Sequence, residues 1–307
     1  MTENHTRLTG GGDTLIEPWF HRAEHKDANL TDDEADVVRQ LKTEGLAVID
    51  LLVEEDDAYF DQFLTSLGPD YGSLPRQGNL WKRSAPARAI AGHERVLNYL
   101  RKAYGRDPFP FQTLNFPHGT EQATHSDTIH FNTYPEHFMC GVWVALEDIT
   151  PQNGPLHYYP GSHMLPSYAL SDIGIVSNGK RSHAAYERFY EPFVLARIEQ
   201  LGLERVELTV KRGQAVIWCA NLLHGGSPIL DKSRTRHSQV THYYFKGCVY
   251  YTPMFSDPML RKIAYTRPHD IRTGRRVNPS YLGKNVSIPI RHRVVDWMRD
   301  IRDILGL

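Results

Sequence analysis

Apolar residues in roughly the first hundred positions recur mainly at the spacing of amphipathic helices. In the segment 54–67, the aromatic residues and leucines fall on one face of a helix. The sequence T-x-x-E from Thr31 to Glu34 is a capping box, which indicates the start of an earlier helix. Residues 69–88 are rich in Pro, Gly and Arg and are predicted to form a loop. The expected elements are a helix over 31–43, a strand over 46–53, and helices over 54–67 and 93–104.

From Pro110 onward, the chain changes to short runs of β-branched and aromatic residues separated by turn signals, such as PGSH at 160–163 and KRGQ at 211–214. One longer helix is expected at about 184–201. Many short strands with regular turns are typical of a sandwich or barrel. We therefore predict a mainly β protein with flanking helices and a double-sheet jelly-roll core. The expected strands are FQTLNF (111–116), THSDTIHF (124–131), MCGVWVALEDI (139–149), LHYY (156–159), VELTV (206–210), AVIWCANLL (215–223) and HSQVTHYYF (237–245).

The sequence has no internal repeat, no long linker and no second apolar core, which favours a single domain over 1–307. The basic C-terminal part ends in a segment, about 290–305, with the pattern of an amphipathic helix. The basic side chains of this part could meet a phosphate or a carboxylate, but a solvated surface is the favoured interpretation. They are Arg261, Lys262, Arg267, Arg272, Arg275 and Arg276. The predicted parts are a poorly ordered segment 1–28, a helical wrap 29–108, a jelly-roll core with a helical insert 109–250, and a C-terminal tail and helix 251–307.

Composition excludes several classes of protein. The 307 residues carry a formal net charge of −1, so neither nucleic acid nor an anionic membrane surface is indicated as a partner. The three cysteines lie far apart, which argues against a disulfide framework or a thiolate zinc site. No N-terminal signal pattern and no apolar run of about 20 residues are present. We therefore expect a cytoplasmic protein that acts on a small molecule.

The stretch HSDTIHF, residues 125–131, carries the candidate chemistry. If it is a strand, His125 and Asp127 project from the same face. One imidazole and one carboxylate are two ligands of the 2-His-1-carboxylate triad that holds Fe(II) with open positions. The candidate third ligand is His224, which follows a predicted strand. With sixteen histidines, an H-x-D pair also arises by chance, and the second copy, His25 to Asp27, is interpreted as surface.

Two arginines follow the distal histidine. The outer carboxylate of an oxoacid cosubstrate such as 2-oxoglutarate needs a counter-charge in a partly dry site, and the planar fork of arginine meets a carboxylate with two hydrogen bonds. An arginine on the strand after His224 can reach the same barrel. The candidates are Arg234 and Arg236, and for Arg234 simple surface charge is the favoured interpretation.

The motifs HSD, YYPGSH, LLHGG and RTRHSQVTHYYF together resemble the phytanoyl-CoA dioxygenase (PhyH) family of Fe(II)/2-oxoglutarate-dependent oxygenases, over about 111–245. The resemblance implies a double-stranded β-helix core, with His125, Asp127 and His224 as iron ligands. It also implies that Arg236 binds the carboxylate of 2-oxoglutarate, and that molecular oxygen is the oxidant.

The same resemblance implies that Gln112 and Trp143 lie near the cosubstrate, although core packing is an equal account of Trp143. Many relatives have a serine where this chain has Gly226, which puts a hydroxyl contact to the cosubstrate in doubt. Among the other histidines, His130 is expected to be structural or to face the substrate. His163 is expected to stabilise its turn, and His157 to lie on a strand surface.

These expectations predict a dioxygenase that hydroxylates or oxidatively cyclises a small polar metabolite, for example a sugar-containing or secondary-metabolite intermediate, while 2-oxoglutarate is decarboxylated to succinate. Halogenation is disfavoured because Asp127 fills the coordination position that a halide would need. Two alternatives use the same barrel without an oxoacid. One is a metal-dependent cupin-like isomerase or epimerase, and the other is a non-catalytic jelly-roll binding module.

Overall fold

The computed structural model describes residues 17–21, 29–177 and 181–289. The predictions of a poorly ordered 1–16 and 22–28, of a helix at 290–305 and of a surface position for His25 lie outside these residues. Within the described part, Trp19–His21 forms a 3-10 turn and Phe20 is buried against Tyr104.

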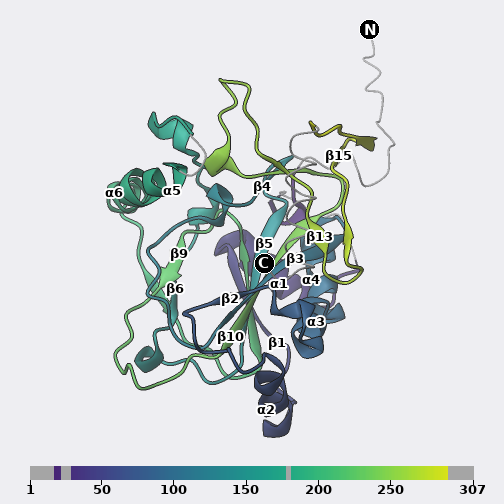
Figure 1. The fold of residues 1–307 in the computed structure, drawn as a ribbon, viewed down its shortest axis with the longest axis vertical. Coiled ribbons are helices and arrows are strands. Elements are labelled where there is room, and N and C mark those ends of the chain that lie inside the picture. The colour runs from purple at the N-terminus through teal and green to yellow at the C-terminus, as the bar shows by residue number, and fades with distance from the viewer. Residues whose placement is uncertain (1–16, 22–28, 178–180, 290–307) are drawn as a thin grey trace.

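A six-stranded antiparallel sheet forms the centre of the fold, in the order β1-β8-β5-β10-β3-β2 (Figure 1). Side chains alternate across it, so that Val142 and Val144 point into one apolar cluster and Trp143 into another. The bounds are β1 Leu46–Asp50, β2 Gln77–Gly78, β3 Pro108–Phe116, β5 Met139–Ala145, β8 Gln214–Cys219 and β10 Ser238–Phe245.

Two three-stranded sheets complete the jelly roll, in the orders β7-β6-β9 and β12-β11-β4. Several of their strands, namely β6, β9 and β12, border one cavity. The predicted mainly β jelly-roll core with flanking helices is confirmed. The bounds are β4 Asn132–Tyr134, β6 Leu156–Tyr158, β7 Val206–Leu208, β9 His224–Gly226, β11 Val249–Tyr251 and β12 Tyr265–Thr266.

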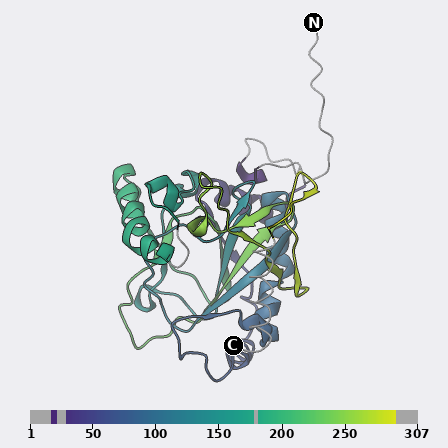
Figure 2. The ribbon, with the colours of Figure 1, turned by 45° about the horizontal axis from the view of Figure 1, so that its top comes forward.

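Helices cover the central sheet on one side, and a separate helical insert lies on the other (Figures 1 and 2). The capping box at Thr31 is present, with both of its reciprocal hydrogen bonds to Glu34. The bounds are α1 Asp32–Thr43, α2 Asp57–Ser66, α3 Ala85–Ala91 and α4 Glu94–Tyr104 on the first side, and α5 Arg181–Ala185 and α6 Glu191–Leu201 in the insert, joined by a π-helical stretch Tyr186–Tyr190.

Two sequence predictions of local structure are wrong. The stretch 69–88 is not a plain loop, because it contains β2, a 3-10 turn at Leu80–Lys82 and the start of α3. THSDTIHF is not a strand, because Asp127–Ile129 forms a 3-10 turn. The hydroxyl of Ser126 caps that turn by accepting from the backbone N–H of Thr128, a local bond that competes with strand pairing.

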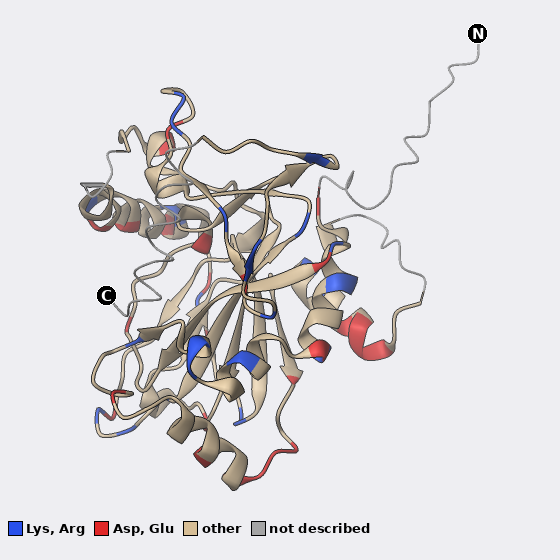
Figure 3. Cartoon of the chain, turned by 45° about the vertical axis from the view of Figure 1, so that its right-hand side comes forward, with Lys and Arg blue, Asp and Glu red and all other residues tan. Residues whose placement is uncertain are grey.

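The C-terminal part returns over the strand-rich core. Ile271 donates its backbone N–H to Pro110 of β3, and Ser280 donates to Cys248. In the view of Figure 3, basic and acidic segments are interspersed rather than gathered on one face. None of the described helices is long and apolar enough to cross a membrane. The short strands are β13 His269–Asp270, β14 Arg275–Arg276, β15 Ser280–Tyr281 and β16 Lys284–Asn285.

Candidate functional site

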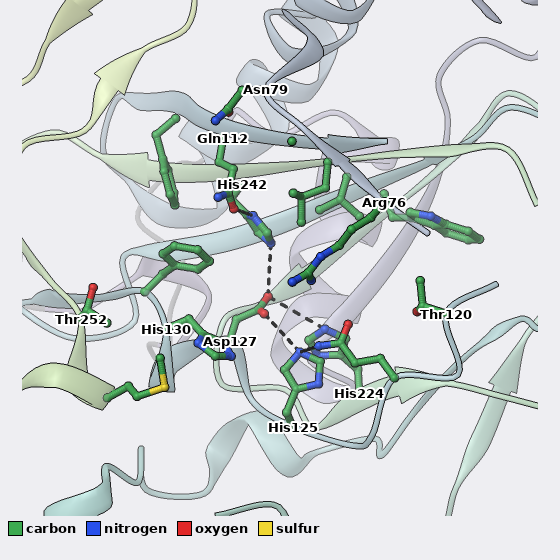
Figure 4. Close-up of a pocket in the computed structure, with 18 of the residues that line it drawn as sticks. Arg76, Asn79, Gln112, Thr120, His125, Asp127, His130, His224, His242 and Thr252 are labelled. Carbon is green, nitrogen blue, oxygen red and sulfur yellow. Dashed lines mark hydrogen bonds and ion pairs between the residues drawn. The ribbon is translucent and has the colours of Figure 1, made fainter. Parts of the chain in front are cut away.

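His125, Asp127 and His224 converge beside the central sheet, with one ligand atom of each within 4.8 Å of the others (Figure 4). Nε2 of His125 lies 3.6 Å from Oδ1 of Asp127, and Nε2 of His224 lies 4.0 Å from Oδ2. All three side chains are nearly buried. Among the described residues, this is the one group of three or more potential ligands so placed.

Pairing of two distant segments positions the histidines. His125 and His224 form an isolated antiparallel bridge, in which each backbone N–H donates to the other's carbonyl at 3.0 Å. Asp127 joins them from the 3-10 turn that follows, held by backbone bonds from His130 and Phe131 to its carbonyl oxygen. The prediction that His125 and Asp127 meet was therefore right, but the strand alternation offered as the reason was wrong.

Backbone carbonyls fix which nitrogen of each imidazole faces the centre. Nδ1 of His125 lies 2.9 Å from the carbonyl oxygen of Ala123, and Nδ1 of His224 lies 3.0 Å from that of Leu222. Since a carbonyl only accepts, each Nδ1 carries the proton and each Nε2 presents a lone pair toward Asp127. Two imidazole nitrogens and one carboxylate are a donor set that fits Fe(II).

The indole of Trp218 forms a hydrogen bond with the carboxylate of Asp127. Its Nε1–H donates to Oδ2 of Asp127 at 2.9 Å, in a buried position. Trp218 can lie there because the facing residue on β5 is Gly141, where a Cβ would come within 2.1 Å of the indole ring. The contact between Trp218 and Gly141 was not predicted, because nothing in the sequence near either residue indicates that they meet.

His242 is a third imidazole at the centre, and its position was also missed. Its Nε2 lies 3.7 Å from Oδ2 of Asp127, and its Nδ1 donates to Oε1 of Gln112 at 2.9 Å. The sequence did contain an indication of this position. Arg236, Val240 and His242 are separated by even numbers of residues, so an extended chain points them to the same side, and all three line the cavity. Gln112 also lines the cavity, with His242 as its partner.

Burial and mutual charge determine the protonation of the centre. Burial disfavours the Asp127 carboxylate, but the surrounding histidines, His224 and His125 foremost, outweigh this cost and hold its pKa well below the usual range. Burial lowers the pKa of His224 to about 4, against the opposing pull of Asp127. The carboxylate is therefore ionised and His224 is neutral at pH 7, which are the states that bind a divalent metal. Despite burial, the interaction with Asp127 raises the pKa of His125, so a metal that binds there competes with a proton on this imidazole.

Arg236 is a buried cation in the same cavity, only 2% exposed. Its Nη1 donates to the carbonyl of Gly154 at 2.8 Å, and its guanidinium lies 5.6 Å from the Trp143 ring centroid. Its Nε has no hydrogen-bond acceptor among the described residues. Burial lowers its pKa to about 10, so the guanidinium remains charged and fits an anionic partner in the cavity.

Arg234 lies on the surface, as predicted, whereas Trp143 lies in the interior. Arg234 is exposed and forms an ion pair of 3.2 Å with Asp231. Trp143 is buried and borders the cavity, so packing and proximity to a cosubstrate are both compatible with its position. The absence of a serine at Gly226 has a structural reason, because a Cβ there would come within 3.0 Å of backbone atoms of Gln122 and Glu121.

Three further histidines have defined surroundings. His130 lines the cavity and borders the same space as the candidate ligands. His163 is buried, and its Nε2 lies 3.2 Å from the carbonyl of Lys42, so it joins two segments rather than stabilising its own turn alone. The surface position predicted for His157 is wrong. His157 is buried, and its Nε2 lies 2.8 Å from the Thr124 hydroxyl oxygen. The ring has space there because the residue opposite on the neighbouring strand is Gly225.

The three candidate ligands, Trp218, His242 and Arg236 border one cavity of about 840 Å³, a volume within the range of small-molecule sites. All six residues that the sequence singled out line it. Arg76 was missed, since the loop around it carried no signal, and its guanidinium points toward the metal centre in Figure 4. Other lining residues are Phe111, Gln122, His130, Phe131, His183, Tyr186, Glu187, Tyr244, Met254, Phe255, Arg267, His269 and Arg276.

Comparisons with known proteins agree with this fold. The family model for phytanoyl-CoA dioxygenase (PhyH) matches residues 33–238. Phytanoyl-CoA dioxygenase domain-containing protein 1 of Bos taurus is 31% identical over 109 residues, a match that spans 34% of this chain and 38% of the bovine protein. The chain thus matches well under half of that curated relative.

Solved structures show the fold relationship. The carbocyclase SnoK from nogalamycin biosynthesis, described as a non-heme α-ketoglutarate-dependent enzyme, has a TM-score of 0.57 at 15% identity, covering 84% of this chain and 97% of SnoK. The apo form of EctD from S. alaskensis has a TM-score of 0.57 at 17% identity, covering 87% and 93%. The epimerase SnoN from the same biosynthesis has a TM-score of 0.51 at 17% identity, covering 71% and 84%.

Proposed function

This chain belongs to the phytanoyl-CoA dioxygenase family, and we propose that it hydroxylates or oxidatively cyclises a small polar metabolite while 2-oxoglutarate is decarboxylated to succinate. Family membership makes it an oxidoreductase that uses Fe(II) and 2-oxoglutarate. The substrate, the outcome of the reaction and the role of each residue are the proposal.

The observation that carries the proposal is the combination of the His125–Asp127–His224 centre with the buried Arg236 in one cavity. A metal centre alone is compatible with an isomerase, and a buried cation alone with many binding proteins. A charged guanidinium in an interior position is costly unless an anion pairs with it. An oxoacid that reaches from the metal centre to Arg236 satisfies both groups.

In this proposal, His125 and His224 bind Fe(II) through Nε2 and Asp127 binds it through a carboxylate oxygen. The bound iron supplies the activation of oxygen that allows an unreactive C–H bond to be oxidised. Ala123 and Leu222 keep both imidazoles in the binding tautomer through their carbonyls. Because Asp127 occupies its ligand position, a halide has no place there, which favours hydroxylation or ring closure over halogenation.

The cavity residues orient the cosubstrate and keep water out. Arg236 binds the outer carboxylate, and the Trp143 ring beside it shields that ion pair from solvent. Arg76, whose guanidinium points toward the metal centre, is placed to contact the other end of the cosubstrate. Gln112 holds the ring of His242, and so limits the space open above Asp127.

The size of the cavity and its mixture of aromatic and polar side chains support a substrate of modest size with polar groups. The descriptions of two structural neighbours name a reaction or a bound small molecule. SnoK is a carbocyclase, and EctD has been solved with 2-oxoglutarate and 5-hydroxyectoine. These relatives share the fold at low identity, so they support the class of substrate and leave its identity to experiment.

The decisive test is an anaerobic titration of metal-free protein with Fe(II) and then with 2-oxoglutarate, followed by visible absorption. A chelated oxoacid gives a weak charge-transfer band. We expect the band in wild-type protein, its loss in Asp127→Ala and its weakening in Arg236→Ala. Arg234→Ala is the matched control, since this arginine is exposed, and it should behave as wild type.

Absence of the band in correctly folded wild-type protein would contradict the proposal and favour an isomerase or a binding module. A band that survives Asp127→Ala would contradict the ligand assignment alone. Once the band is established, candidate substrates can be compared by the rate of succinate release, which rises when the correct substrate is bound.

A further inference from the structure

A pair of arginines from the C-terminal part, Arg267 and Arg276, borders the cavity, and the cosubstrate does not account for them. We propose that they form a binding site for an oxyanion, a carboxylate or a phosphate, carried by the substrate. This inference rests on the proposed function, because it assumes that iron and 2-oxoglutarate occupy the other charged groups.

The charge of the occupied cavity supports this site. Ferrous iron with Asp127, and the dicarboxylate 2-oxoglutarate with Arg236, cancel to a formal charge of zero. The other charged side chains that line the cavity are Arg76, Arg267 and Arg276 against one carboxylate, Glu187. The loaded cavity therefore retains a net positive charge, which low-dielectric walls intensify and which an anionic substrate would neutralise.

The β13–β14 hairpin directs its charges unequally. Asp270 is buried and held by Arg272 through two contacts of 2.8 and 3.0 Å, so this carboxylate is neutralised outside the cavity. The neighbouring pair of the hairpin, His269 and Arg276, faces the opposite side, and both residues line the cavity. Arg275, adjacent in sequence, is exposed and does not line it. Strand alternation thus places a guanidinium at the cavity and leaves the acid on the other face.

Arg267 and Arg276 are held in fixed positions. A guanidinium N–H of Arg276 donates to the carbonyl of Arg267, and Nη2 of Arg267 donates to Oδ1 of Asn278 at 3.0 Å. The Asn278 amide is neutral, so it orients the Arg267 guanidinium without cancelling its charge. Among the described residues, no carboxylate forms an ion pair with Arg267. Two oriented planar forks are the usual means of recognising a carboxylate or phosphate.

An aromatic wall indicates what the anion is attached to. Phe111 stacks on Tyr244 with ring centroids 4.0 Å apart and lies 5.3 Å from Phe131, and all three rings line the cavity. Met254 and Phe255 add apolar surface. Rings and a thioether bind an apolar or cyclic body through dispersion and burial. The substrate class that fits is a molecule with a ring or other apolar body and one oxyanion group.

The test measures binding directly, without turnover. Wild-type protein saturated anaerobically with Fe(II) and 2-oxoglutarate is titrated calorimetrically with phenylacetate, phenyl phosphate and the neutral isostere phenylacetamide. The variants are Arg267→Gln and Arg276→Gln, with Arg275→Gln as the matched exposed control. Thermal melting verifies folding, and Arg267→Gln carries the test if loss of the Arg276 hydrogen bond impairs folding.

We expect at least one of the two anions to bind about tenfold or more tightly than phenylacetamide. We expect Arg267→Gln to abolish that preference and Arg275→Gln to keep it. Preference for the carboxylate or for the phosphate then distinguishes the two sources of the oxyanion. Equal binding of the neutral and anionic probes, or an unchanged preference in Arg267→Gln, would overturn the inference. The charge-transfer band of the iron–2-oxoglutarate complex is recorded on the same samples. An intact band without a preference for the anion would refute this site alone. A missing band would refute the proposed function.

Discussion

Replacing Trp218 with phenylalanine tests whether the indole holds Asp127 in its ligand position. The change removes the Nε1–H that donates to Oδ2 of Asp127 at 2.9 Å and leaves a buried carboxylate oxygen without this donor. The phenyl ring retains most of the buried apolar contact. We therefore expect folding to persist and metal binding to weaken.

The expected magnitude follows from two independent estimates. A hydrogen bond to a charged group contributes about 1.5–3 kcal/mol. Loss of a group that orients a metal ligand reduces metal affinity by about 10- to 100-fold, which equals about 1.4–2.8 kcal/mol. Because the two ranges coincide, we expect the Fe(II) affinity of Trp218→Phe to fall by about 10- to 100-fold.

Anaerobic calorimetry with Fe(II) measures this affinity, and Trp143→Phe is the matched control. Trp143 is equally buried and borders the same cavity, but it makes no hydrogen bond to Asp127. Its replacement should leave Fe(II) affinity within about twofold of wild type. Equal Fe(II) affinity in Trp218→Phe and wild type, with both proteins folded, would refute the idea that the indole positions the carboxylate.

Three further predictions follow from particular contacts. Gly141→Ala places a Cβ within 2.1 Å of the Trp218 ring, so thermal unfolding should reveal a loss of about 1–3 kcal/mol together with weaker metal binding, and unchanged metal affinity would contradict this coupling. Arg236→Lys keeps the charge but loses the planar fork, so titration of the charge-transfer band should show about tenfold or weaker 2-oxoglutarate binding, and wild-type affinity would argue against a two-bond clamp. Burial lowers the pKa of His163 from 6.5 to about 4, so between these pH values the unfolded chain binds the proton that the folded chain rejects, and stability falls as pH drops. His163→Gln should remove up to about 3 kcal/mol of that loss in urea unfolding at pH 7 and pH 4, and an unchanged pH dependence would refute this assignment.

Elements whose signals are local agreed best with the sequence. The capping box at Thr31 and Glu34 defines α1 because both of its hydrogen bonds lie within four residues. Strands β3, β5, β8 and β10 were visible because β-branched and aromatic residues fit a pleated, buried surface. Local rules failed at THSDTIHF, where the Ser126 hydroxyl forms a turn in place of a strand.

The sequence by itself determined which residue types the candidate site contains. His125, Asp127, His224 and Arg236 could be selected because their chemistry matches a metal and an oxoacid, and because their motifs resemble one family. All four line the same cavity. Residue type and spacing are enough for this selection, since ligand chemistry depends on the side chain rather than on the path of the chain.

Only the tertiary structure decided how these groups are held and what else faces them. The bridge between His125 and His224, the bond from Trp218 to Asp127 and the approach of His242 all join segments far apart in the sequence. Such contacts arise from strand pairing and close packing, which no local pattern encodes. The tail arginines illustrate the limit, since the sequence indicated a solvated surface and the fold of the β13–β14 hairpin brings Arg276 to the cavity.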